Sequence, residues 1–144
     1  MKQLFFSLAL FLVFEVNTFA ADTAVSPNIL QSFKKTFSNA KEVVWSANKD
    51  VFKAEFVYSS QYISAYYDAD GNMLALTKNI LSTQLPVLLE TSLKEDYCGY
   101  WIADVLELST EEGTSYYTTL ENADEKLILK SSQNNWMVSK KIKK

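Results

Sequence analysis

Apolar positions in the first half of the chain change from the period of a helix to the period of strands. Ser26 and Pro27 form an N-cap and first-turn pair, after which Ile29, Leu30 and Phe33 recur at helical spacing. The helix is predicted to end near Ser38. Alternating apolar and polar residues then predict four strands, over 43–46, 51–58, 61–67 and 72–78, separated by short turns rich in Asn, Asp, Ser and Gly.

The second half follows the same order of elements. Ser82 or Thr83 is predicted to cap a helix whose apolar stripe is formed by Leu85, Leu88, Leu89 and Leu93. Four strands are predicted after it, over 100–109, 114–121, 126–131 and 136–142.

These two halves can be aligned with each other without a gap. Residues 52–75 fall on residues 116–139, and the Asp70-Gly71 turn falls on Asn134-Asn135. The predicted fold class is α+β, with two tandem repeats at about 26–80 and 82–142 packed as one domain over 22–144. Each repeat is expected to have one helix on one face of a four-stranded antiparallel meander, which leaves the other face open.

A signal peptide is predicted over residues 1–21. Lys2 precedes the apolar run from Leu4 to Phe14, and Thr18-Phe19-Ala20 offers small residues at the positions before a cleavage site. The alternative is a buried N-terminal helix. With a signal peptide, the mature protein is expected to be periplasmic or secreted and to have no membrane span.

The composition argues against several classes of function. The chain contains no His, no Arg and one Cys, Cys98. Without His it lacks Ser-His-Asp and Cys-His catalysis, and without Arg or a basic face it does not resemble a nucleic-acid binder. A lone Cys cannot form an internal disulfide, and Cys98 is predicted to be a small buried residue, with a reactive or intermolecular thiol as the alternative. The protein is therefore not expected to be an enzyme, and no cofactor or metal is expected.

Lysines gather at the C-terminus. Four of the last five residues are Lys, and without them the net charge of −3 would be −7. This tail is predicted to be solvated and frayed, with contact to an anionic surface as the alternative.

Several segments together resemble a family of exported proteins. They are the runs 40–45 (AKEVVW), 65–74 (AYYDADGNML), 99–102 (GYWI) and 114–117 (TSYY). They are similar to the PepSY-like, β-lactamase-inhibitor-like proteins common in Bacteroidetes, over about residues 25–141. The resemblance implies two α+β repeats with antiparallel sheets, and it brings no catalytic residues. The single Cys differs from the disulfide-held inhibitor protein of that fold.

Two acidic segments have an alternative interpretation. Asp68-Ala69-Asp70-Gly71-Asn72 resembles the start of a calcium loop, but position twelve is Asn79 in place of Glu, so a hairpin turn is predicted. The clusters at 111–112 and 121–125 lie in predicted turns, where solvation should leave the carboxylates ordinary.

Aromatic and basic residues share the face of the predicted sheets that points away from the helices. The candidate protein-binding residues are Tyr62, Tyr66, Tyr117, Lys53, Lys126 and Lys130. Exposed Tyr supplies large contact area at low entropic cost, which suits protein recognition. The competing interpretation is that cross-strand Tyr pairs only stabilise the sheet. The predicted function is an exported, non-enzymatic protein that binds a protein or peptide. The alternative is a periplasmic carrier of a small ligand or cation.

Overall fold

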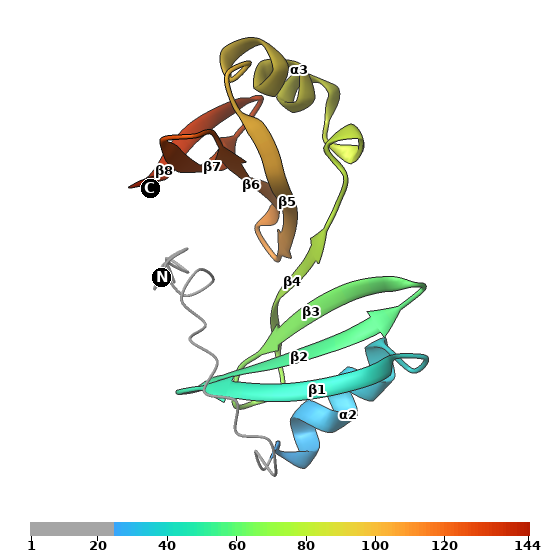
Figure 1. Cartoon of the computed structure of the whole chain (residues 1–144). Coiled ribbons are helices and arrows are strands. Elements are labelled where there is room, and N and C mark those ends of the chain that lie inside the picture. The colour runs from blue at the N-terminus through green and yellow to red at the C-terminus, as the bar shows by residue number, and fades with distance from the viewer. Residues whose placement is uncertain (1–24) are drawn as a thin grey trace.

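The chain forms a helix and four strands, then a second helix and four more strands (Figure 1). The computed structural model describes residues 25–144. The predicted signal peptide, 1–21, lies outside the described residues. The elements in chain order are α2 Pro27–Thr36, β1 Lys41–Asn48, β2 Val51–Tyr58, β3 Gln61–Tyr67, β4 Met73–Asn79, the 3₁₀ turn η1 Ser82–Gln84, α3 Val87–Asp96, β5 Trp101–Thr110, β6 Gly113–Glu121, β7 Glu125–Ser132 and β8 Asn135–Lys143.

Helix α2 begins where the sequence predicts. The Ile29 amide donates to Ser26 Oγ at 3.5 Å, and Pro27 occupies the first helical position. The helix ends at Thr36, slightly earlier than expected, because Phe37 leaves helical geometry. Ile29 and Phe33 are buried against the sheet.

Helix α3 begins later than the sequence predicts. Ser82–Gln84 forms a 3₁₀ turn, and Leu85 is extended because it precedes Pro86. The α-helix therefore starts at Val87, and its register differs from the predicted one. Leu85, Leu89 and Leu93 are buried, whereas Leu88 is exposed, so its predicted place in the stripe is wrong.

All eight strands belong to one antiparallel sheet, in the order β1 to β8. The sequence predicted the strands but placed them in two separate meanders. The two groups are joined because β4 pairs with β5 from Leu76 opposite Ser109 to Asn79 opposite Leu106. This pairing satisfies backbone groups that two separate sheets would leave at open edges.

Pairing registers recur along the chain. Phe56 lies opposite Ile63 in the β2–β3 hairpin, and 64 residues further on Leu120 lies opposite Leu127 in the β6–β7 hairpin. The first strand of each group also has a register irregularity near its start, between Lys41 and Val44 in β1 and between Ile102 and Asp104 in β5.

Three clusters of buried residues form the core. The first, under α2, consists of Ile29, Phe33, Phe37, Ala54, Phe56, Ile63, Ala65 and Tyr67. The second, under α3, consists of Leu85, Leu89, Leu93, Val105, Leu120, Leu127, Leu129 and Trp136. The third consists of Tyr66, Ala75, Leu108 and Tyr117, which come from β3 to β6. A core on this third surface was not predicted.

The C-terminal lysines form part of the sheet. Strand β8 extends to Lys143 and pairs with β7 along its length. The predicted frayed tail is therefore wrong: Lys140, Lys141, Ile142 and Lys143 are exposed, but their backbone is paired with β7.

Candidate functional site

Both helices cover the same face of the sheet. Ile63 of the α2 cluster lies opposite Lys78, which lies opposite Glu107, which lies opposite Tyr116 beside the α3 cluster. Directly paired residues share a face, so α2 and α3 are on one side. Figure 1 nevertheless places the helices at opposite ends of the molecule, with the strands between them. The sheet must therefore curl, and its helix-free face lies on the inside of the curve.

The three candidate tyrosines all lie on this helix-free face, but their exposure differs. Tyr62 is 78% exposed, as predicted, whereas Tyr66 is 5% exposed and Tyr117 is 7% exposed. The prediction that Tyr66 and Tyr117 are open to solvent is therefore wrong. The β4–β5 pairing brings them into one cluster with Ala75 and Leu108, and the curl of the sheet buries them there.

A groove of about 600 Å³ lies beside these residues on the helix-free face. We call it the β3 groove. Its lining comes from β2, β3, β4 and β5, and the residues that matter here are Lys53, Glu55, Tyr62, Tyr66, Thr77 and Leu106. Buried Tyr66 and Thr77 form the inner part of this lining, and exposed Tyr62 stands at its rim. The groove therefore combines a buried inner lining with an exposed aromatic side chain at its rim.

Each of the three candidate lysines lies beside an acidic or aromatic side chain. Lys53 Nζ lies 2.7 Å from Glu55 Oε1 and 6.0 Å from the centroid of the Tyr66 ring. Lys130 Nζ lies 5.7 Å from the centroid of the Tyr117 ring. Lys126 Nζ lies 3.0 Å from Glu121 Oε1.

Burial affects the titration of the groove. It raises the pKa of the Tyr66 hydroxyl, and hydrogen bonds with Thr77 and Ser64 only partly offset this rise. Tyr66 is therefore a neutral, hydrogen-bonded part of the lining at neutral pH. Its hydroxyl is held within the fold.

The structure brings Lys53, Tyr62 and Tyr66 together at the β3 groove, while Lys126, Lys130 and Tyr117 lie on β6 and β7. Sequence reasoning missed Leu106, which reaches the groove from β5. No local pattern could identify it, because Leu106 joins the groove only through its pairing with Asn79. Thr77 could have been found, since strand alternation places it on the face of Ala75.

The loop that resembles a calcium site is closed by its own hydrogen bonds. Asp68 Oδ1 accepts from the backbone amides of Asp70 and Asn72, and Asp68 Oδ2 accepts from Asn72 Nδ2. Partial burial opposes ionisation, but these hydrogen bonds outweigh it and lower the pKa of the Asp68 carboxyl. The arrangement is that of a hairpin turn. No group of three or more potential metal ligands occurs among residues 25–144.

A second charged cluster lies on the helix-covered side, at the start of β7. Tyr100 donates to Glu125 Oε1, and Lys141 Nζ lies 2.6 Å from Glu125 Oε2. The hydrogen bonds from Lys141 and Tyr100 lower the pKa of Glu125, and Glu125 raises the pKa of both partners. The hydrogen bonds from Lys144 and Lys126 likewise lower the pKa of Glu121, so the expectation that the carboxylates at 121–125 are ordinary is wrong for both Glu121 and Glu125. This cluster ties the start of β5 to β7 and β8.

Cys98 follows α3 and is exposed, which contradicts its predicted burial. It lies in the turn between α3 and β5, outside all three clusters of the core.

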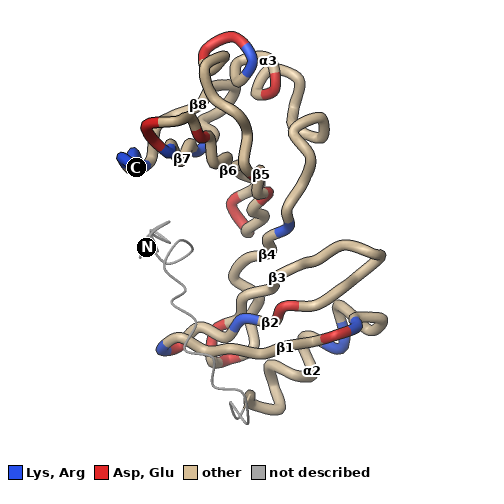
Figure 2. Tube along the Cα trace, viewed as in Figure 1, with Lys and Arg blue, Asp and Glu red and all other residues tan. Residues whose placement is uncertain are grey.

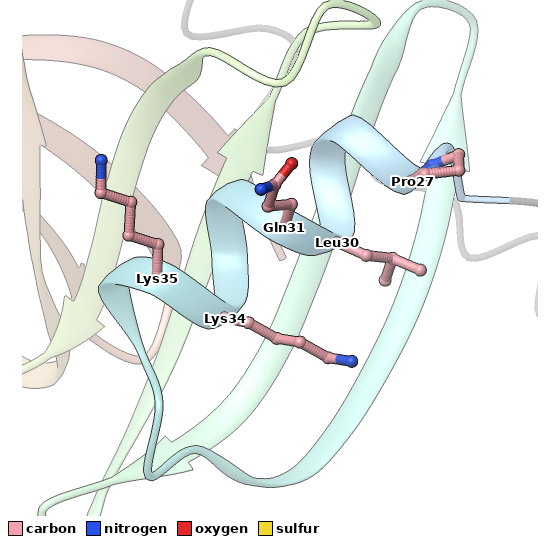
Figure 3. A pocket seen from close by; sticks show the side chains of 5 residues that line it. All are labelled: Pro27, Leu30, Gln31, Lys34 and Lys35. Atoms are coloured by element: carbon pink, nitrogen blue, oxygen red, sulfur yellow. The ribbon is translucent and has the colours of Figure 1, made fainter.

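A shallow hollow of about 540 Å³ lies along the outer side of α2 (Figure 3). It is lined by Pro27, Leu30, Gln31, Lys34 and Lys35, all from this helix. Leu30 and Lys34, one turn apart, project to the same side in Figure 3. Because one helix supplies the whole described lining, the hollow offers no opposing wall to enclose a ligand.

The fold is BLIP-like, where BLIP stands for β-lactamase inhibitor protein. A BLIP-like protein from Bacteroides fragilis matches with 22% identity, 82% of this chain, 85% of that chain and a TM-score of 0.68. A DUF2874 family protein from Bacteroides ovatus matches with 16% identity, 85% and 89% coverage and a TM-score of 0.73. A protein from Bacteroides eggerthii, named as a candidate periplasmic protein, matches with 12% identity, 83% and 88% coverage and a TM-score of 0.73.

No family model and no curated protein matches the sequence. At these identities the solved structures establish the fold alone, and they assign no residue of this chain a role. Within the part of the chain that the structure describes, no helix is long and apolar enough to cross a membrane.

Proposed function

We propose that this protein is an exported, non-enzymatic binding protein that engages a protein or peptide through the helix-free face of its sheet. The observation that carries the proposal is Tyr62, which is 78% exposed at the rim of the β3 groove. A large exposed aromatic side chain beside a partly apolar groove is typical of a recognition surface. Lys53 and Glu55, at the same groove, would orient a partner by charge.

Export is part of this proposal. The N-terminal sequence has the features of a signal peptide, and a protein of the same fold from Bacteroides eggerthii is named as a candidate periplasmic protein. Both observations support a periplasmic or secreted localisation. The relationship to PepSY-like proteins, which rests on the sequence motifs, is also part of this proposal.

We also infer that the sheet arose from two repeats. The recurrence of the Phe56–Ile63 pairing at Leu120–Leu127 supports this, as do the irregularities at corresponding ends of β1 and β5. A repeated unit that conserves pairing while its surface residues diverge would serve as a scaffold for binding.

The test is affinity capture from the native envelope and culture fluid, with the mature protein and its Tyr62→Ala variant side by side. Leu88→Ala is the matched control, because Leu88 is exposed on α3 and lies away from the groove. The proposal expects a protein that is enriched by the native form and the control and lost with Tyr62→Ala. Binding of the purified partner should then weaken about tenfold or more, as for an interface hot spot. Capture that Tyr62→Ala leaves unchanged would contradict the proposed surface.

Inhibition of a β-lactamase or a protease is a special case of this proposal. Titration of candidate enzymes with the purified protein tests it, and unchanged enzyme activity at saturating protein would remove it.

A small-ligand carrier is the second candidate function. The β3 groove, at about 600 Å³, falls within the range of small-molecule sites. A thermal shift on adding hydrophobic or anionic ligands, abolished by Leu106→Trp, would support this candidate. A cation carrier at Asp68 is less favoured, since that carboxylate already accepts three hydrogen bonds.

A further inference from the structure

Strand β8 is the last strand of the sheet, and it carries lysines along its end. Within the described residues it pairs only with β7, and every β8 side chain except that of Trp136 is exposed. Its sequence, NWMVSKKIK, contains no acidic residue. Figure 2 marks the C-terminal end in blue. An open strand edge presents unpaired N–H and C=O groups, and lysines along it repel basic strands and favour an acidic one.

The backbone of this edge points outward at Lys141 and Lys143. The Lys144 amide donates to the Asp124 carbonyl at 2.9 Å, and the same register continues through Lys143 opposite Glu125 and Lys141 opposite Leu127. Hydrogen-bonded and non-hydrogen-bonded pairs alternate in an antiparallel ladder. The backbone of Lys144 is hydrogen-bonded to Asp124, beside β7, so Lys143 and Lys141 occupy non-hydrogen-bonded positions. Their backbone N–H and C=O groups therefore face away from β7.

The charges on this edge are only partly neutralised. Lys141 pairs with Glu125 at 2.6 Å, and Lys144 pairs with Glu121 at 2.9 Å. Lys140 has no ion-pair partner in the described part of the chain. The edge therefore remains basic on a protein whose net charge is −3.

The opposite edge of the sheet is less suited to pairing. Strand β1 is irregular between Lys41 and Val44, and Glu42 there has a φ of 54°. It also carries both charges, Lys41 and Glu42, near its start. An irregular edge of mixed charge neither continues the ladder nor selects a partner by charge.

We propose that the β8 edge from Lys140 to Lys144 binds an extended, acidic segment of a partner protein as an added strand. The outward backbone groups of Lys141 and Lys143 supply the hydrogen bonds, and acidic side chains lie across from Lys140 and Lys143. A second copy of this chain is disfavoured at the same edge, because two β8 strands would bring lysine against lysine. The alternative role for these lysines is only to prevent edge pairing.

The test uses the ¹⁵N-labelled mature protein and a short blocked peptide of Val and Thr with two Glu three positions apart, which matches the spacing of Lys140 and Lys143 on β8. The proposal expects the amides of Lys141 and Lys143 to exchange rapidly with solvent in the free protein and to be protected when the peptide is added. Those of Lys140 and Ile142, which face β7, should change little. Absence of selective protection at saturating peptide overturns the proposal.

Backbone methylation separates strand addition from simple attraction of charges. The peptide is made in two forms, each N-methylated at one of the two alternating sets of amides. If the peptide adds as a strand, one methylated form should still bind and the other should not, because only one of the two sets of peptide amides faces β8. Equal binding of both forms, or equal loss, overturns the proposal.

Charge variants supply the matched control. Lys140→Gln with Lys143→Gln should weaken peptide binding about tenfold, whereas Lys34→Gln with Lys35→Gln, on the outer side of α2, should leave it unchanged. Equal weakening by both pairs overturns the proposal. Binding to vesicles of phosphatidylglycerol in place of the peptide also overturns it and assigns the lysines to a membrane surface.

Discussion

Lys130 Nζ lies 5.7 Å from the centroid of the Tyr117 ring, its direct neighbour across β6 and β7. Lys53 and Tyr66 form the corresponding cross-strand pair on β2 and β3, at 6.0 Å. The order is exchanged: lysine precedes tyrosine in the first hairpin and follows it in the second. Both tyrosines face the third cluster, so each lysine borders the buried centre of the helix-free face.

Truncation of the buried tyrosines is expected to destabilise the fold. Tyr66→Ala or Tyr117→Ala should lower the free energy of unfolding by about 3 kcal/mol or more, because each leaves a cavity in the third cluster. Tyr62→Ala should change it by less than about 0.5 kcal/mol, since Tyr62 is exposed. Urea denaturation measures all three. A loss for Tyr62→Ala as large as that for Tyr66→Ala would contradict the assigned burial.

Tyr67 has a buried hydroxyl with no hydrogen-bond partner in the described structure. Burial raises the pKa of this hydroxyl to about 12. Tyr67→Phe removes the unpaired group and keeps the ring beside Trp45, so the free energy of unfolding should rise by about 1 kcal/mol. Thermal or urea unfolding checks this, with Tyr58→Phe as the control. A clear loss of stability would show that the hydroxyl has a partner.

The raised pKa of Tyr67 also predicts a loss of stability at high pH. The unfolded chain releases the tyrosine proton near its ordinary pKa of 10.0, whereas the folded chain holds it up to about 12. Below pH 10 both states hold the proton, so the free energy of unfolding does not depend on it. As the pH rises from 10 toward the folded pKa of about 12, the unfolded chain loses the proton first and the free energy of unfolding falls. Tyr67→Phe should flatten this alkaline decline. An unchanged pH profile would contradict the burial of the hydroxyl.

Gly71 is required by the turn between β3 and β4. Its φ is +90°, and an added Cβ would lie 3.1 Å from the backbone carbonyl of Asn28 at the start of α2. Gly71→Ala should therefore cost about 1–2 kcal/mol of stability, from backbone strain and displacement of α2. Gly99→Ala is the control, because a Cβ there meets nothing within 4 Å. Equal costs for the two variants would argue against the close approach to Asn28.

Trp136 connects β8 to α3 through a hydrogen bond. Its Nε1 donates to the Leu89 carbonyl at 2.9 Å in a buried position. Trp136→Phe loses this hydrogen bond and part of the packing, so the free energy of unfolding should fall by about 1–3 kcal/mol. Circular dichroism follows the transition without relying on tryptophan fluorescence. Trp101→Phe, at an exposed position, should have a much smaller effect, and the reverse order would refute this role.

The Tyr100–Glu125–Lys141 cluster predicts sensitivity to acid. Hydrogen bonds from Lys141 and Tyr100 lower the pKa of Glu125 from its ordinary value of 4.5. The unfolded chain therefore takes up this proton first as the pH falls. The stabilisation is present above pH 4.5 and is lost as the pH falls through the lower folded value.

Glu125→Gln should therefore lower the melting temperature at neutral pH and make its decline between about pH 5 and about pH 3 shallower. Glu112→Gln, in the exposed β5–β6 turn, removes the same charge and should leave the acid profile unchanged. Parallel acid profiles for Glu125→Gln and the native protein would argue against the cluster.

Local chemistry in the sequence was sufficient to predict most of the elements. Strands β2 and β3 have the predicted bounds because apolar and polar residues alternate in the middle of Val51–Tyr58 and Gln61–Tyr67, and turn residues flank both segments. The start of α2 was also predictable, since its N-cap and Pro27 act on neighbouring residues. The start of α3 was missed because Pro86 forces Leu85 into an extended conformation, which overrides the leucine spacing.

Tertiary structure decided which face is a surface and which is a core. Alternation places Tyr62 and Tyr66 on the same side of β3, but it cannot distinguish 78% exposure from 5%. That difference depends on the pairing of β4 with β5, whose residues are about thirty apart in sequence, and on the curl of the joined sheet. The sequence by itself determined local geometry because turns, caps and alternation act between neighbours. Burial of Tyr66 and Tyr117, the β3 groove and the open β8 edge required the whole sheet, because each depends on contacts between distant segments.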